Sequence, residues 1–144
     1  MSGADAAMIQ QLAAALESRA EVLDAYLFGS TARGAAMAHS DVDVAVFIDR
    51  TVASSSSYGY EADLTSHLMS SLHTNRVDVV LLNQASPLLY HRVLRDGVRV
   101  LSRDLQASTV REGYALSRYC DYLPQLAKVE IALKARIRAG DFAR

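Results

Sequence analysis

The sequence predicts an α/β (α+β) protein with a small mixed sheet of about four strands, flanked by helices and followed by a long C-terminal helical segment. Short apolar runs rich in β-branched residues recur along the first hundred positions. Between them lie segments whose apolar residues repeat every three or four positions, which indicates amphipathic helices. The last of these segments extends from Asp104 to about Arg138. Alternating strands and helices of this kind favour a layered fold.

The first half of the chain gives two helices and two strands. A helix is expected at residues 5–19, where Asp5 is a residue type suited to capping. Its apolar positions are Ile9, Leu12, Ala13 and Leu16. Strands are expected at Val22–Phe28 and Val42–Ile48. A serine-containing loop at residues 50–58 precedes a second helix, whose apolar positions are Tyr60, Leu64, Leu68 and Leu72.

The second half continues with the run Val77–Leu82, which is compact and β-branched enough to be a buried strand. Pro87–Arg95 reads as a helix with proline at its start and Gly97 after its end. A short fourth strand is expected at Val98–Ser102.

The long segment from Asp104 to about Arg138 is expected to be helical, and Pro124 is expected to kink or divide it. Its apolar positions at helical spacing are Tyr114, Leu116, Tyr119, Leu123, Leu126, Val129, Leu133 and Ile137. Core packing is the expected role of most of the stripe that Tyr114, Tyr119 and Tyr122 form with Leu116 and Leu123, and a docking surface for a partner is the alternative.

Length and composition restrict the class of protein. With 144 residues, about half of them apolar, we expect one domain over residues 1–144, with a core at about 20–103 and the helical segment at about 104–139. The net charge of −1 disfavours a nucleic acid as the main partner. Neither a membrane span nor a signal peptide is evident, and the single cysteine, Cys120, is expected to be buried and inert. We therefore expect a cytoplasmic protein.

The informative stretch begins where the first predicted strand meets Gly29-Ser30. A strand that runs into Gly-Ser at the start of a short helix presents unpaired backbone N–H groups to a polyphosphate. Glycine allows close contact, and Ser30 adds a hydroxyl. Arg33 could contact the triphosphate or equally anchor its own turn by pairing with an aspartate. This segment is therefore a candidate nucleotide-binding loop.

Two carboxylates follow in Asp41-Val42-Asp43. Residues two apart on a strand point to the same side, so Asp41 and Asp43 lie together. Mg²⁺ is the natural cation between them, because it takes hard oxygen ligands from one or two carboxylates and completes its shell with water and phosphate. If the strand that carries Asp78 pairs beside Val42–Ile48, Asp78 joins the same site. Three such carboxylates could hold two Mg²⁺ ions, and Asp78 could also accept a proton from the acceptor hydroxyl.

At these residues the chain resembles the DNA polymerase β-type nucleotidyltransferases, whose signature is Gly-Ser, a spacer, Asp-x-Asp and a later third aspartate. Within that superfamily it is similar to the minimal nucleotidyltransferase (MNT) antitoxins of HEPN/MNT toxin–antitoxin modules. Matching segments include Asp78–Asn83, Pro87–Tyr90 and Arg118–Pro124. The resemblance implies a nucleotidyltransferase fold, ATP as substrate, and transfer of AMP to a tyrosine of a HEPN ribonuclease toxin held in a hetero-oligomer.

The residues leave two other functions open. The protein could neutralise a toxin by occupying it, with transfer secondary or absent. It could also be a nucleotidyltransferase that modifies a small hydroxyl compound such as an aminoglycoside, although the chain has no large second domain to build such a pocket. A templated polymerase is disfavoured because there is no room for a thumb or template-binding parts.

Overall fold

The computed structural model describes residues 3–29, 41–52 and 57–140. Its core is a four-stranded sheet in the order β3-β2-β1-β4. The strands are β1 (Val22–Phe28), β2 (Val42–Ile48), β3 (Val77–Leu81) and β4 (Val98–Ser102). β1 pairs antiparallel with β2 and β4, whereas β2 and β3 are parallel. The predicted mixed sheet of four strands flanked by helices is confirmed.

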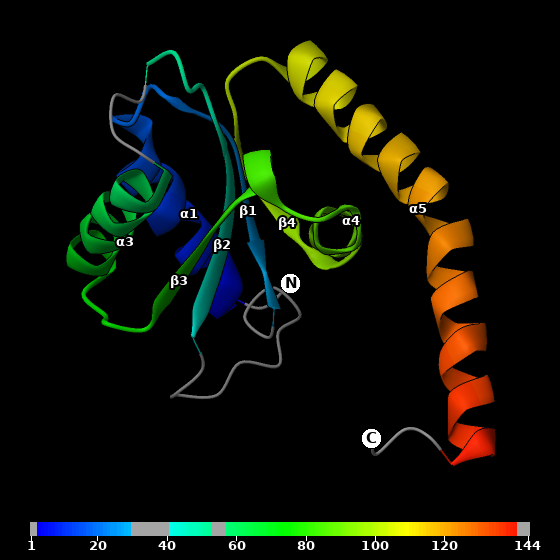
Figure 1. Cartoon of the computed structure of the whole chain (residues 1–144). Coiled ribbons are helices and arrows are strands. Elements are labelled where there is room, and N and C mark those ends of the chain that lie inside the picture. Colours follow the sequence, from blue (N-terminus) through cyan, green and yellow to red (C-terminus); the bar gives the residue numbers. More distant parts are fainter. Residues whose placement is uncertain (1–2, 30–40, 53–56, 141–144) are drawn as a thin grey trace.

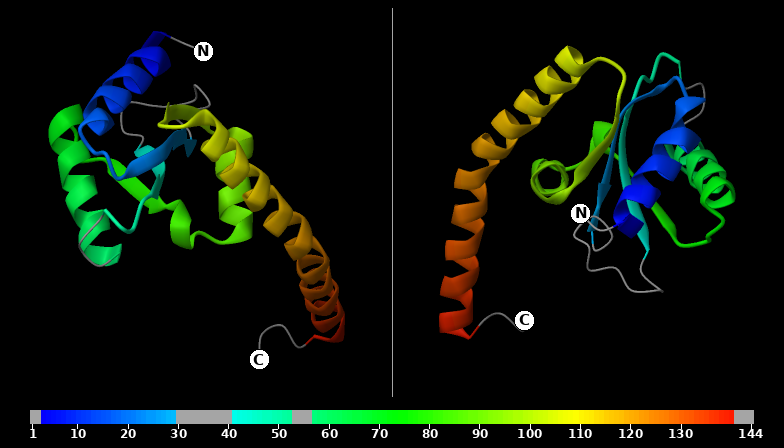
Figure 2. Two further views of the ribbon diagram at one scale, coloured as in Figure 1. Left: turned by 90° about the horizontal axis from the view of Figure 1, so that it is seen from above. Right: turned by 180° about the vertical axis from the view of Figure 1, so that it is seen from behind.

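One face of the sheet is covered by α1 (Gly3–Glu17) and α3 (Ser57–Leu72), as Figures 1 and 2 show. Leu12 and Leu16 of α1 and Leu64 and Leu68 of α3 are fully buried against β1 and β2. These are the apolar positions that the helical spacing selects. The first helix begins two residues earlier and ends two residues earlier than expected.

The opposite face is covered by α4 (Pro87–Asp96) and the first half of α5 (Leu105–Ala139). The 3₁₀ turn η1 (Leu82–Gln84) follows β3, so the third strand ends one residue before its predicted end. Ser86 caps α4 by accepting a hydrogen bond from the Leu89 N–H at 3.2 Å, and Pro87 occupies the first turn. Asp104 caps α5 in the same way, through the N–H groups of Gln106 and Ala107.

The long helix α5 is continuous through Pro124, so of the two predicted outcomes, a kink or a division, the division does not occur. Proline removes one backbone hydrogen bond and crowds the preceding turn, which bends a helix more often than it ends it when the flanking turns remain intact. Figures 1 and 2 show such a bend about midway along α5, beyond which the helix leaves the body of the molecule.

That departure corrects two expectations about burial. Most large apolar residues of α5 are exposed rather than in the core. Leu105, Val110, Tyr114 and Leu116 are exposed in the first half of the helix, and Leu123, Val129, Ile131, Leu133 and Ile137 are exposed in the second half, which leaves the body of the molecule (Figure 1). Cys120 is also exposed, so its predicted burial is wrong.

None of the helices in the described part of the chain has the length and apolar character that crossing a membrane requires.

Candidate active site

The site begins at the end of β1, where Gly29 has a φ of +78°. This left-handed backbone region strongly favours glycine. A Cβ atom built on Gly29 would also collide with Oδ2 of Asp43 and lie 3.1 Å from its Cγ. Glycine is therefore required by both the backbone and the neighbouring carboxylate.

Strand pairing brings the aspartates together. Phe28 of β1 pairs with Asp43 of β2, and Asp43 pairs in parallel register with Asp78 of β3. Register partners on neighbouring strands project from the same face of a sheet and are separated by about 4.8 Å. The hypothesis that the third strand pairs beside the second, which would place Asp78 in the same site, is borne out in its geometry. Asp41 immediately precedes β2 on the same side as Asp43.

The electrostatics show that these carboxylates affect one another. The pKa of Asp43 is raised above its ordinary value, first because the side chain is partly buried and then because Asp78 and Asp41 are negatively charged. Asp41 and Asp78 are exposed, whereas Asp43 is half-buried between them. A cation at this position would relieve the repulsion.

The donor set fits Mg²⁺ delivered with a nucleotide. Among the described residues, no group of three acidic, histidine or cysteine side chains is placed to hold a metal ion, and this includes Asp41, Asp43 and Asp78. Mg²⁺ does not need such a group, because proteins usually hold it through one or two carboxylates while water and substrate phosphates fill the remaining positions. Asp43 and Asp78 provide hard oxygens beside Gly29.

Ser30 and Arg33 lie outside the described residues, so their predicted nucleotide contacts remain predictions. His67 and His91 both have contacts with other parts of the chain. His67 Nε2 lies 2.8 Å from the carbonyl oxygen of Ala15, and the His91 ring stacks on Tyr119 with 3.6 Å between ring centroids.

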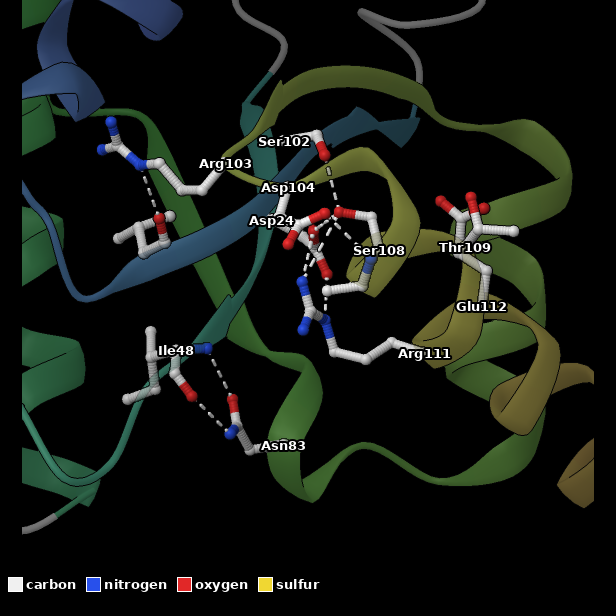
Figure 3. A network of polar contacts seen from close by, with 12 residues as sticks. Asp24, Ile48, Asn83, Ser102, Arg103, Asp104, Ser108, Thr109, Arg111 and Glu112 are labelled. Atoms are coloured by element: carbon white, nitrogen blue, oxygen red, sulfur yellow. Dashed lines mark hydrogen bonds and ion pairs between the residues drawn. The ribbon is translucent and has the colours of Figure 1, made fainter.

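A buried ion pair that the sequence analysis missed joins α5 to the sheet (Figure 3). Asp24 of β1 is fully buried, and its two oxygens accept hydrogen bonds from Nε and Nη2 of Arg111 at 2.7 and 3.0 Å. The hydroxyl of Ser108 also donates to Asp24. The signal for this pair was a single acid inside an otherwise apolar strand, which needs a partner when it is buried.

This fold and site define a nucleotidyltransferase: a mixed sheet whose first strand ends at a glycine packed against Asp43, with Asp78 beside Asp43 on the next strand. Residues 10–106 match the family described as "Polymerase beta, Nucleotidyltransferase". The match covers more than half of the chain, and the protein belongs to this family.

Solved structures of similar fold include toxin–antitoxin complexes. One, a toxin–antitoxin with AMP-PNP, contains a chain that is 24% identical with a TM-score of 0.72, over 87% of this chain and 98% of that one. A mutant of toxin–antitoxin MntA–HpeT gives 25% identity and a TM-score of 0.68, over 86% and 96%. A tri-AMPylated HEPN toxin from Shewanella oneidensis in complex with MNT antitoxin gives 22% and 0.60, over 90% and 95%. No curated protein matches the sequence.

Proposed function

We propose that this nucleotidyltransferase is an antitoxin that uses Mg²⁺ to transfer AMP from ATP to a tyrosine of a cognate HEPN ribonuclease toxin, which silences the toxin. The observation that carries the proposal is the packing of Gly29 against Asp43, with Asp78 beside it in register. The similar structures add support, because one contains an ATP analogue and another a HEPN toxin already carrying AMP groups.

We assign the binding of the donor triphosphate to the segment that follows β1. Gly29 has a left-handed backbone at the end of the strand, and its missing side chain leaves room for the Asp43 carboxylate beside the segment that we assign to the phosphates. Ser30 and Arg33 are assigned to the same phosphates. Asp41 and Asp43, with Asp78 beside them, are assigned to the metal.

The reaction needs few protein groups. The acceptor hydroxyl oxygen forms a bond to the α-phosphorus while the bond from that phosphorus to the bridging oxygen breaks, and pyrophosphate leaves with the bond electrons. Asp78 is the group we assign to take the hydroxyl proton, because it is exposed at the edge of the site. When bound, Mg²⁺ neutralises the charge that develops on the phosphates. The protein chiefly contributes positioning.

The second half of α5 supports the proposal that this protein binds another protein. In the first half, Ser108, Arg111 and Ala115 face the body of the molecule. Steps of three or four residues carry this face beyond the body as a continuous apolar stripe. We call Leu126, Val129, Leu133 and Ile137 the distal inner face.

This face is suited to a protein surface because it continues a packed one. Val129 is 63% exposed, and Leu133 and Ile137 are each 50% exposed. Apolar side chains that continue the packing face of a helix, with nothing over them, mark an interaction site. We assign it to the toxin.

The same face favours a second candidate function, in which the protein neutralises the toxin by binding alone. Such an antitoxin would need α5 but not the aspartates. The two candidates therefore differ in what happens when the carboxylates are removed.

Co-expression with the cognate HEPN toxin separates them. The intact mass of the toxin is measured after co-expression with wild type, with Asp41→Ala/Asp43→Ala, or with the control Glu61→Gln, which removes a partly exposed charge on α3. AMP-sized increments with wild type and the control, but not with the double variant, are expected. An unmodified toxin in all three samples contradicts transfer. Full protection of cells by the double variant favours binding alone.

A further inference from the structure

A cavity of about 450 Å³ lies on the α4–α5 face of the sheet, near the carboxyl end of β2. Its volume falls within the range of small-molecule pockets. Its lining is mostly apolar, with a few polar groups. The lining residues that matter here are Phe47, Leu82, Tyr90, Tyr114, Ala115 and Arg118.

The cavity is separate from the candidate active site. Asp43, Ala45 and Phe47 alternate along one face of β2, so the cavity lies about 13 Å along the strand from Asp43. Ala45 is fully buried between the two, in a core cluster with Tyr90 and Val93 of α4. A nucleotide bound at Asp43 therefore has no open route into the cavity.

Tyr90 gives the cavity an unsatisfied polar group. Only 4% of this residue is exposed, yet among the described residues its hydroxyl finds no hydrogen-bond partner. Burial raises the pKa of Tyr90 to about 12, so the hydroxyl stays protonated and can donate at neutral pH. Buried hydroxyls are nearly always paired, and one without a partner at a cavity wall indicates a missing ligand or water.

Arg118 gives the cavity a cation. The other arginine in the lining, Arg111, is held by Asp24 (Figure 3). Its guanidinium lies over the ring of Phe47. Arg118 makes no ion pair with any residue in the described part of the chain. Guanidinium groups bind carboxylates and phosphates in a planar, two-point geometry. The cavity thus combines aromatic walls, one free hydroxyl and one available positive charge.

We propose that this cavity is a second ligand site that binds a small organic anion, in which an aromatic ring is joined directly or through a sugar to one carboxylate or phosphate. The ring packs against Phe47 and Tyr114, the Tyr90 hydroxyl donates to the ligand, and Arg118 pairs with the anionic group. This site is independent of the transfer reaction. The ligand belongs to one of two chemical classes, the nucleoside monophosphates or the aromatic carboxylic acids.

The test measures binding of two probes, AMP and benzoate, to the full chain by NMR titration in EDTA, without Mg²⁺ or ATP. Benzyl alcohol lacks the charge and cyclohexanecarboxylate lacks the aromatic ring, so both are expected to bind more weakly than benzoate. Saturable binding of AMP alone identifies a nucleotide source, and binding of benzoate identifies an aromatic acid. If neither probe binds, or benzyl alcohol binds as well as benzoate, the proposal is overturned.

Variants locate the binding. Tyr90→Phe keeps the packing and is expected to weaken probe binding about 2- to 12-fold, the range for one neutral hydrogen bond. Arg118→Gln is expected to weaken it about 10- to 100-fold, as for a charged hydrogen bond. Arg92→Gln, an exposed arginine of α4 outside the cavity, is the matched control.

Asp43→Asn separates this site from the proposed function, because it is expected to abolish transfer and leave probe binding unchanged. Equal binding by wild type and Arg118→Gln would overturn the proposal. So would a crystal structure with a water on the Tyr90 hydroxyl and no probe in the cavity.

Discussion

Replacing Asp43 by asparagine should stabilise the metal-free protein while abolishing its activity. Asp43 and Asp78 are register partners on adjacent strands, so their charges lie about 5–6 Å apart. Two unit charges at that separation repel by about 0.8 kcal/mol in water and about 3 kcal/mol at an effective dielectric constant of 20. Because Asp78 is exposed, the lower part of this range applies. We expect a gain of about 1 kcal/mol, or about 4 °C in Tm.

The stability of the metal-free protein should fall with rising pH in part because of Asp43. Folding raises the pKa of Asp43 above its ordinary value of 3.8, through burial, Asp78 and Asp41 in that order. The native state therefore holds this proton more tightly than the unfolded state. The contribution of this bound proton to the free energy of unfolding is fully present below pH 3.8 and is lost as the pH rises through the raised pKa of Asp43. In Asp43→Asn this carboxyl is absent, so the part of the fall in stability with rising pH that Asp43 causes is absent as well.

Urea unfolding in EDTA between pH 3 and pH 8 measures both effects, with Glu61→Gln as the control that removes a distant carboxylate. Adding Mg²⁺ and ATP should make wild type more stable than Asp43→Asn, because only wild type retains the full carboxylate set and ligand binding stabilises the folded state. The reasoning is refuted if metal-free Asp43→Asn is less stable than wild type, or if both lose stability identically as the pH rises.

Three other substitutions test separate parts of the structure. Gly29→Ala should cost about 1–2 kcal/mol for the left-handed backbone and, by displacing Asp43, lower transfer on the order of 100-fold; wild-type rates in a transfer assay would contradict this. Arg111→Ala leaves the fully buried Asp24 without its cation, so urea unfolding should show a loss of about 3–5 kcal/mol, and a loss below about 1 kcal/mol would be inconsistent with the buried pair. Leu133→Glu should prevent capture of the HEPN toxin in a pull-down without changing the ATP-induced thermal shift. Retained capture would mean that the toxin does not bind the distal inner face.

The strands were predictable because their signal is local. Compact β-branched runs place all four strands within a residue of their observed bounds, and Asp78 follows from the position of its strand. The pairing of Asp43 with Asp78 was a hypothesis that needed the sheet order, which no local pattern contains. Burial of Asp43 between its neighbours is likewise a property of the assembled sheet.

The long helix shows what periodicity leaves open. Apolar residues at helical spacing indicate that one face of α5 is covered, but they do not say whether the covering surface belongs to the same chain. Val129 and Leu133 continue the packing face of Ala115 and are nevertheless exposed. The prediction of core burial was wrong because it assumed an intramolecular partner.

Asp24 was missed for a different reason. An acid within an apolar strand has two outcomes, solvent or a buried partner, and the partner here is Arg111, which lies 87 positions away in the sequence. Only the packing of α5 across β1 brings the two together. Long-range pairs of this kind are fixed by tertiary structure rather than by local pattern.

The central claim is that this chain transfers a nucleotidyl group through the site built by Gly29, Asp43 and Asp78. The most direct measurement incubates the purified protein and its HEPN toxin with Mg²⁺ and ATP labelled on either the α- or the γ-phosphate. Nucleotidyl transfer predicts that the α-label enters the toxin, the γ-label leaves in pyrophosphate, and Asp43→Asn transfers neither. Label from the γ-phosphate on the toxin, or undiminished transfer by Asp43→Asn, would contradict the claim.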